Sequence, residues 1–119
     1  MTWNGTRDDS GWIDLTPTAA GGTGTCRYRT LAGGRLVELS MSTSGASIPT
    51  GPSSPTEVIA PADFPAAIRP TTAAAYGRGT TTGNAGIDII VNTSGSVTVA
   101  NPTGSTAGAV RCSVVYMAG

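Results

Sequence analysis

The fold of this chain is decided most clearly by the stretch IDIIVNTSGSVTV, residues 87–99. Runs rich in isoleucine and valine stand on both sides of the polar segment NTSGS, which carries a glycine near its end. Two β-branched runs joined by a short polar turn are typical of a β-hairpin. The stretch therefore predicts two antiparallel strands, at residues 87–91 and 97–99.

A second hairpin is predicted around the turn LAGG, residues 31–34. Apolar and polar residues alternate through residues 25–30 and again through residues 35–43. In the longer run, valine, leucine and methionine share one face, and glutamate and serine share the other. This alternation is typical of a strand pair with one buried and one solvated face.

Weaker signals complete the predicted set of strands. Four further strands are expected at residues 12–16, 57–60, 72–76 and 109–117. The inward residues of the last strand are expected to be Val110, Cys112, Val114 and Tyr116. Residues 44–55 and 77–86 are rich in turn-forming residues and are expected to be loops. Residues 61–70 are expected to be an ordered connector, because three prolines restrict the backbone and Phe64 and Ile68 supply side chains to bury.

The composition supports an all-β fold. Glycine (17), threonine (19), serine (11) and proline (8) make up nearly half of the 119 residues. Glycine and proline break helices and threonine disfavours them, whereas short strands joined by turns use all of these residues. About eight strands at this spacing predict one domain with an antiparallel β-sandwich or jelly-roll-like fold. Only six residues are aromatic, so the hydrophobic core is expected to be thin. Association of copies would bury one face of the sheet and compensate for this, which predicts a homo-oligomer.

The charged residues exclude several kinds of function. Seven scattered arginines balance seven acidic residues, so neither nucleic acid nor an anionic membrane is an expected partner. The chain has no histidine and no lysine, which excludes Ser-His-Asp catalysis, histidine metal sites and Schiff-base chemistry within it. Four acids, Asp14, Glu38, Asp63 and Asp88, are formal candidates for a glycosidase pair, but their spacing singles out no two of them. We therefore expect no catalytic residue, no metal site and no cofactor.

The candidate binding residues are Tyr76 and Arg78, in the sequence YGRG. An aromatic ring beside a flexible polar loop can stack on a sugar ring, and a nearby guanidinium can donate hydrogen bonds to its hydroxyl groups. The two residues therefore predict a glycan-binding site. The alternative is that Tyr76 is a core residue at a strand end and Arg78 is solvated. Trp12 is expected to be structural, whereas Trp3, near the N-terminus, is expected to dock the chain onto another protein.

The two cysteines, Cys26 and Cys112, are too few and too far apart for a zinc site of the C-x-x-C kind. Each lies in an alternating strand pattern, and two interpretations remain open. They are two buried thiols, or they form a disulfide between neighbouring strands. The N-terminus does not resemble a signal peptide and no apolar run is long enough for a membrane helix, which predicts a soluble protein made inside a cell and favours the thiols.

Six motifs follow one another along the chain: SGWIDLT (10–16), YRTLAGGRLVEL (28–39), PADFPAAIRP (61–70), GIDI (86–89), the turn and strand at 92–99, and VVY (114–116). Taken in this order, they resemble the distal β-sandwich domains of the minor tail, tail-fibre and receptor-binding proteins of tailed bacteriophages. The resemblance extends over nearly the whole chain from Ser10.

This resemblance implies a function in a phage virion. Such domains are typically trimeric, jelly-roll-like heads that bind saccharides on the host cell surface. Residues 10–119 are then expected to be the head domain, and residues 1–9 an extension that docks onto other virion tail proteins. The protein is expected to be made in the host cytoplasm and to act in the virion as a homotrimer, without cofactor. The alternative is a structural virion protein, a capsid decoration or tail-tip adaptor, that binds only other virion proteins.

Overall fold

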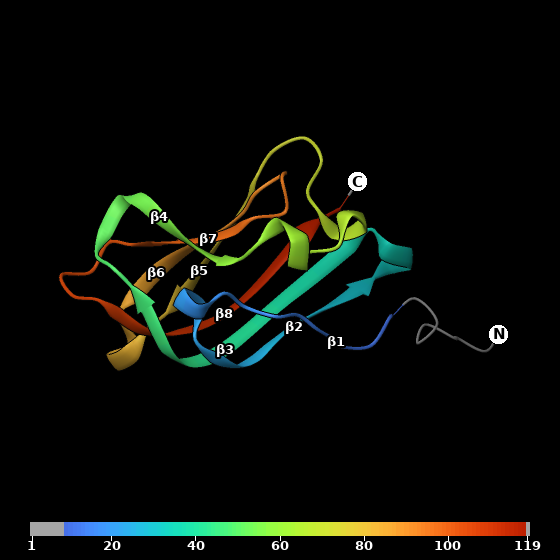
Figure 1. Ribbon diagram of the computed structural model, residues 1–119. Helices are drawn as coiled ribbons and strands as arrows, with labels where there is room; N and C mark the ends of the chain where they lie inside the picture. Colours follow the sequence, from blue (N-terminus) through green and yellow to red (C-terminus); the bar gives the residue numbers. More distant parts are fainter. Residues whose placement is uncertain (1–8, 119) are drawn as a thin grey trace.

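The computed structural model describes residues 9–118, which form a single eight-stranded antiparallel sheet (Figure 1). The strands are β1 (Ile13–Asp14), β2 (Thr23–Leu31), β3 (Leu36–Ile48), β4 (Gly51–Ile59), β5 (Ala75–Thr80), β6 (Gly86–Val91), β7 (Val97–Asn101) and β8 (Ala107–Met117). The helices are single 3-10 turns: η2 (Ala19–Gly21), η3 (Ala32–Gly34), η4 (Pro61–Asp63), η5 (Ala66–Ile68) and η6 (Thr82–Asn84). No helix within residues 9–118 is long and apolar enough to span a membrane. The prediction of an all-β antiparallel chain with about eight strands is confirmed.

The sheet is curled, so that its two edges approach each other. The strand order is β1-β2-β3-β8-β5-β6-β7-β4, which places β1 and β4 at the edges. The backbone of the segment that follows β1 forms hydrogen bonds with strands near both edges of the sheet. The amide of Leu15 donates to the carbonyl of Cys26 on β2, and the amide of Thr18 donates to the carbonyl of Val58 on β4, each over 2.8 Å. This one segment therefore links the edge of β2 to the edge of β4.

Both predicted hairpins are confirmed, and they supply most of the core inside the curl. In the hairpin of β6 and β7, Ile89 pairs with Val99 and Val91 pairs with Val97. Every second residue of this hairpin faces the core, where Ile87, Ile89, Val91, Val97 and Val99 are fully buried. In the hairpin of β2 and β3, the inward residues Cys26, Tyr28, Val37, Leu39 and Met41 are also buried. The period of two in the sequence thus decides which side of each strand faces the core.

The connector at residues 61–70 is ordered, as predicted, and it closes one part of the core. Phe64 and Ile68 are 1% and 3% exposed. The hydroxyl of Tyr116 on β8 donates to the carbonyl of Ile68 over 2.6 Å. The guanidinium of Arg69 donates to the carbonyls of Pro61 and Phe64, at 2.9 and 3.0 Å. The two 3-10 turns of the connector are therefore held by side chains as well as by their own backbone.

The predicted loop at residues 44–55 is wrong. Strand β3 continues to Ile48 and β4 begins at Gly51, so only two residues separate them. The alternation of β3 resumes after Gly45, because Ala46 and Ile48 are both buried. The prolines of β4 lie between its first paired residue and Thr56, where β4 forms no backbone ladder with β7. Proline lacks an amide donor and is tolerated at such an unpaired edge.

The predicted strand at 72–76 and loop at 77–86 are also wrong in their boundaries, because β5 runs through the glycine-rich segment. A Cβ atom on Gly77 would lie 2.6 Å from Cγ2 of Val114, and one on Gly79 would lie 2.6 Å from the carbonyl oxygen of Arg111. The two glycines therefore allow β5 to pass close to β8, where a larger residue would collide. Glycine inside a strand often marks such a close approach.

Two other predicted strands differ in their bounds. The strand predicted at residues 12–16 is shorter, since β1 covers only Ile13–Asp14, and the strand predicted at residues 109–117 begins earlier, at Ala107.

Candidate functional site

The outer face of β5 and β6 carries the candidate binding residues. On β5 the inward positions are occupied by small residues, so the large side chains of this strand, Tyr76 and Arg78, project outward. On β6, Asp88 and Ile90 alternate with buried isoleucine and valine and therefore also face outward. The register places Tyr76 opposite Ile90 and Arg78 opposite Asp88. Alternation and register together bring these four side chains into one patch.

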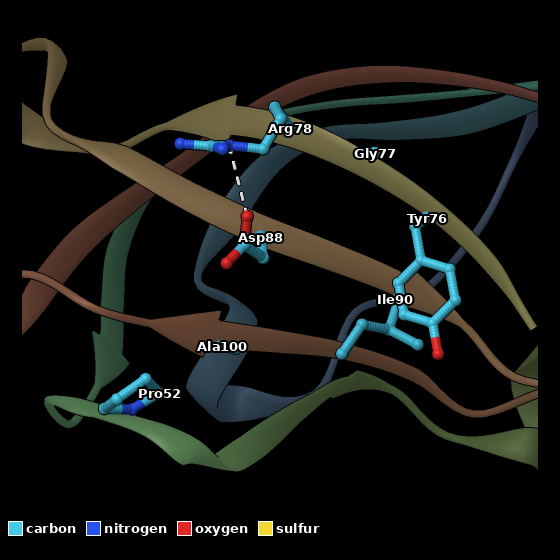
Figure 2. Close-up of a pocket in the computed structure, with 7 residues that line it drawn as sticks. All are labelled: Pro52, Tyr76, Gly77, Arg78, Asp88, Ile90 and Ala100. Carbon is cyan, nitrogen blue, oxygen red and sulfur yellow. Dashed lines mark ion pairs between the residues drawn. The ribbon is translucent and has the colours of Figure 1, made fainter.

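The patch opens into a depression of about 320 Å³, which we call the Tyr76 groove. Its lining residues are Pro52, Tyr76, Gly77, Arg78, Asp88, Ile90 and Ala100. They come from the four consecutive strands β4 to β7, which lie next to one another in the sheet in the order β5-β6-β7-β4, with Ala100 on β7 and Pro52 on the edge strand β4 (Figure 2). Most of the lining is apolar, and its charged groups are one arginine and one aspartate. Apolar walls with a few polar groups are typical of small-molecule sites.

The Tyr76 side chain is exposed to solvent at one end of this groove. It is 74% exposed, and Figure 2 shows its ring beside Ile90. A tyrosine ring exposed to this extent has a face available to stack on a flat apolar surface. The alternative interpretation of Tyr76 as a core residue is therefore wrong.

Arg78 and Asp88 form an ion pair at the same groove. Nε of Arg78 lies 3.1 Å from Oδ1 of Asp88, and the two side chains are 77% and 43% exposed. A Cβ atom on Gly86 would lie 3.2 Å from Nη2 of Arg78, so the guanidinium extends across β6. The pair is a defined group of donors and acceptors that remains open to solvent.

Sequence reasoning found Tyr76 and Arg78 but placed them at the end of a strand and in a loop. The structure brings both together on one strand. Sequence reasoning missed Asp88 and Ile90 as their neighbours, although the alternation in IDIIV already placed both of them opposite the buried residues of that strand. It also missed Pro52 and Ala100. No local pattern identifies these two, because their position depends on the pairing of β4 with β7 and of β7 with β6.

A second group of aromatic and charged residues lies on the outer face of β2 and β3, and we call it the Trp12 cluster. Its members are Asp9, Trp12, Arg27, Arg29, Glu38 and Ser113. The guanidinium carbons of Arg27 and Arg29 lie 4.4 and 4.7 Å from the centroid of the Trp12 ring. Such contacts are favourable cation–π interactions. They support the prediction that Trp12 is structural.

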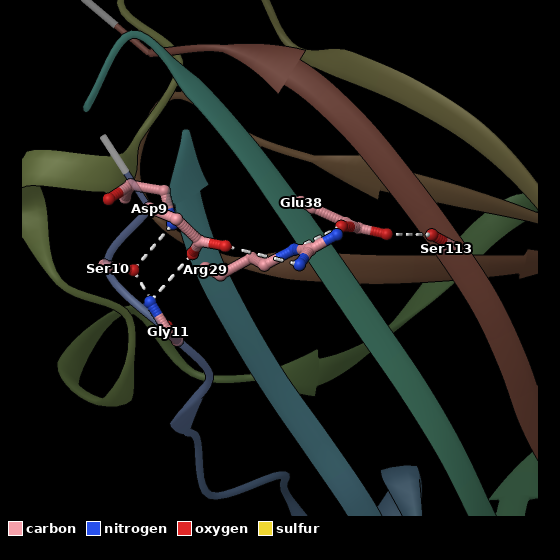
Figure 3. A network of polar contacts seen from close by, with 7 residues as sticks. Asp9, Ser10, Gly11, Arg29, Glu38 and Ser113 are labelled. Atoms are coloured by element: carbon pink, nitrogen blue, oxygen red, sulfur yellow. Dashed lines mark hydrogen bonds and ion pairs between the residues drawn. The ribbon is translucent and has the colours of Figure 1, made fainter. Parts of the chain in front are cut away.

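The polar groups of Arg29, Glu38, Asp9 and Ser113 contact one another within the Trp12 cluster (Figure 3), whereas Nε of Arg27 is buried and has no hydrogen-bond partner among the described residues. Nε of Arg29 donates to Oε1 of Glu38 over 2.7 Å, and Nη1 of Arg29 lies 3.5 Å from Oδ2 of Asp9. The hydroxyl of Ser113 on β8 donates to the other oxygen of Glu38 over 3.1 Å. The network therefore ties the segment before β1 to β2, β3 and β8, and it leaves few groups for a ligand.

The two cysteines are free thiols on strands that are not neighbours. Cys26 on β2 and Cys112 on β8 both pair with Met41 of β3, which lies between them. Two strand spacings, about 9.5 Å, exceed the Cα separation that a disulfide spans. Burial raises the pKa of Cys26 from 9.0 to about 12 and that of Cys112 to about 11. Both groups are therefore protonated, unreactive thiols at neutral pH.

The remaining sequence candidates lie apart from the groove or outside the described residues. Within residues 9–118, no three His, Cys, Asp or Glu side chains are grouped so as to hold a metal ion. Of the four acids considered as a glycosidase pair, Asp88 alone lines the Tyr76 groove. Trp3, and with it nearly all of the proposed docking extension at residues 1–9, lies outside the part that the structure describes.

No protein-family model matches the sequence, and no curated protein matches it closely enough to count as a relative.

Proposed function

We propose that this chain is a non-catalytic saccharide-binding protein and that the Tyr76 groove is its binding site. The observation that carries this proposal is the exposed ring of Tyr76, next to an exposed Arg78–Asp88 ion pair in an open depression. The aromatic face would stack on the C–H face of a sugar ring, and the ion pair would exchange hydrogen bonds with its hydroxyl groups. The open shape suits the end or side of a surface polysaccharide.

The biological setting that we propose follows from the resemblance to phage tail proteins. In this setting the curled sheet is a jelly-roll-like head at a tail tip or tail fibre, and it binds a host cell-surface glycan during adsorption. Residues 1–9, including Trp3, would dock the head onto other virion tail proteins. Binding is non-covalent and uses no cofactor.

The test is adsorption of the isolated protein to host cells and to an array of immobilised bacterial surface glycans. We expect specific binding that Tyr76→Ala weakens at least about tenfold, the equivalent of one lost stacking contact. Tyr76→Phe keeps the ring and is expected to retain most of the binding. Ser47→Ala, at an exposed position of β3 that does not line the groove, is the surface control. Equal binding by the wild type and Tyr76→Ala would remove the groove from the proposal.

The proposed assembly is a homotrimer, and exposed apolar residues on β8 support self-association. Val115 and Met117 are 58% and 64% exposed and project from the outer face of β8. The register places Leu36 of β3 directly opposite Met117. Burial of such a patch between copies would compensate for the thin core. Light scattering should report three chains per particle, and a stable monomer at micromolar concentration would contradict this assembly.

The same apolar patch favours a second candidate function, that of a structural virion protein. In that case Val115 and Met117 would contact another virion protein, and the Tyr76 groove would have no ligand. The adsorption experiment separates the two functions, because a capsid decoration or tail-tip adaptor would bind neither host cells nor glycans. Substitution of Val115 and Met117 by serine would then abolish incorporation into the virion.

A further inference from the structure

We infer that the ligand of the Tyr76 groove is an uncharged oligosaccharide of at least two sugar units, an inference that rests on the proposed saccharide-binding function. Charge is the first argument. The four strands that form this side of the sheet, β4 to β7, carry three charged residues: Arg78, Asp88 and Glu57. Arg78 and Asp88 line the groove, whereas Glu57 does not, so the charged lining consists of one guanidinium and one carboxylate that balance each other.

Glu57 does not line the groove, but it adds a carboxylate to the same outer face. Glu57 pairs with Thr98, which lies next to Ile90 on the outer face. The Glu57 carboxylate is exposed and accepts a hydrogen bond from the hydroxyl of Ser96 over 2.8 Å. Arg111, the arginine of β8, stands opposite Thr80 and does not line the groove. An anionic sugar would have to displace Asp88 from Arg78 against the repulsion of that carboxylate, which disfavours acidic saccharides.

The ion pair itself fits a pair of neighbouring hydroxyl groups. Its contact joins Nε of Arg78 to Oδ1 of Asp88. Within residues 9–118, no hydrogen bond engages the two Nη groups of Arg78 or Oδ2 of Asp88. The site therefore offers donors next to an acceptor. Each hydroxyl of an uncharged sugar both donates and accepts, so two adjacent hydroxyls can use both halves of the pair.

The length of the groove is the second argument. Tyr76 lies on β5 and Pro52 on β4, at opposite ends of the order β5-β6-β7-β4, and the two ladder-paired spacings from β5 to β7 alone measure about 9.5 Å. Between them the groove is lined by Ile90 and by the small side chain of Ala100, which is 5% exposed. This distance is longer than one sugar ring. One ring on Tyr76 therefore leaves room for a second ring over Ala100, towards Pro52 (Figure 2).

The experiment is a calorimetric titration of the full chain with two series of soluble probes. The first contains uncharged mannan, galactan and glucan oligosaccharides of one to four units, and the second contains oligogalacturonates of the same lengths. We expect binding to at least one uncharged series, with a gain of about tenfold between one and two units, and at least about tenfold weaker binding of the acidic series. Pro52→Gly should reduce the gain with length.

Asp88→Asn supplies the matched test of charge, because it keeps the shape of the side chain and removes one carboxylate. It should shift the preference at least about tenfold towards oligogalacturonate. Tighter binding of the acidic series by the wild type, still dependent on Tyr76, would overturn the inference but leave the saccharide-binding function intact. An affinity that does not change from one to four units would overturn the inferred length. If neither series binds and no glycan on the array binds, the proposed function itself is wrong.

Discussion

The Tyr76 groove and the Trp12 cluster contain the same kinds of residue in two different states. Each combines an aromatic ring, a guanidinium and a carboxylate on an outer face of the sheet. At the groove, Tyr76 is 74% exposed, whereas Trp12 is 38% exposed and lies against two guanidinium groups. Arg78 has one carboxylate partner, whereas Arg29 is bound by both Glu38 and Asp9. The first group is open to a ligand, whereas Trp12, Arg29, Glu38 and Asp9 of the second are engaged by one another, and the buried Nε of Arg27 alone has no hydrogen-bond partner among the described side chains.

The difference comes from what covers each face. Residues 10–15 follow the edge of β2, where the amide of Ser10 donates to the carbonyl of Thr30 over 3.0 Å and the amide of Leu15 donates to the carbonyl of Cys26 over 2.8 Å. This segment places Trp12 and Asp9 over the arginines of β2. At the groove, the segment of β4 that includes Pro52 forms one wall and leaves the centre open. Residue types alone therefore do not distinguish a binding site from a structural contact.

The largest expected effect concerns the interior beneath the Trp12 cluster, where the thiol of Cys26 is buried and that of Cys112 is half-buried. The unfolded chain releases thiol protons near pH 9, whereas the folded protein holds those of Cys112 and Cys26 until about pH 11 and 12. Their contribution to stability is therefore complete below pH 9 and is lost as the pH rises towards 12. Urea unfolding should show a loss of about 3 kcal/mol between pH 8.5 and pH 10.5.

The control for this pH dependence is the double variant Cys26→Ala with Cys112→Ala. It should be less stable than the wild type at pH 7, because the buried side chain of Cys26 and the half-buried side chain of Cys112 are both shortened. Its stability should change much less between pH 8.5 and pH 10.5. An equal alkaline loss in this variant would assign the effect to other groups.

The second effect concerns the contact between β5 and β8. This contact joins the half of the sheet that carries the Trp12 cluster to the half that carries the Tyr76 groove. A Cβ atom on Gly79 would lie 2.6 Å from the carbonyl of Arg111 and 2.9 Å from Cβ of Cys112. Gly79→Ala should therefore lower the free energy of unfolding by about 2 kcal/mol, because the backbone of β8 must shift. Gly104→Ala is the matched control, since a Cβ atom there has no neighbour within 4 Å. Equal stability of the two variants would show that β5 and β8 do not approach this closely.

The third effect tests the comparison of the two aromatic residues directly. Trp12→Ala removes a ring that covers two guanidinium groups, and it should cost about 1 to 2 kcal/mol in urea unfolding. Tyr76→Ala removes a ring that is mostly in water, and it should change the stability by less than about 0.5 kcal/mol. Glycan binding should respond in the opposite way, with a loss in the Tyr76 variant alone. A comparable loss of stability in both variants would contradict the distinction between an open and a satisfied cluster.

The smallest effect concerns the two carboxylates. Asp88→Asn should change the free energy of unfolding by less than about 0.5 kcal/mol, because exposed ion pairs contribute little. Glu38→Gln should cost about 1 kcal/mol, because Glu38 accepts hydrogen bonds from both Arg29 and Ser113 in a half-buried position. The difference between the two variants should shrink in 1 M salt, which screens the charge of Glu38. A larger cost for Asp88→Asn would mean that the Arg78–Asp88 pair is structural.

The hairpins were predictable because their signals are local. Turn residues and alternation specify which residues pair and which side chains face inward, as for Ile89 and Val99. The path of β5 was not predictable in this way, because Gly77 and Gly79 have the composition of a loop when they are considered alone. Their function depends on Val114 and Arg111, which lie more than thirty residues further along the chain. The same limitation applied to β4, whose prolines are compatible with a strand only where that strand has no ladder partner.

The sequence by itself determined the fold class, the two hairpins, the inward face of most strands and two residues of the groove, because alternation and turn chemistry act over a few neighbouring residues. Only the tertiary structure decided that Tyr76 and Arg78 line a groove together with Asp88, Ala100 and Pro52. It also decided that the guanidinium groups of Arg27 and Arg29 lie over the Trp12 ring. The order of strands in a sheet depends on contacts between distant segments, and a sequence pattern of period two carries no information about which strands become neighbours.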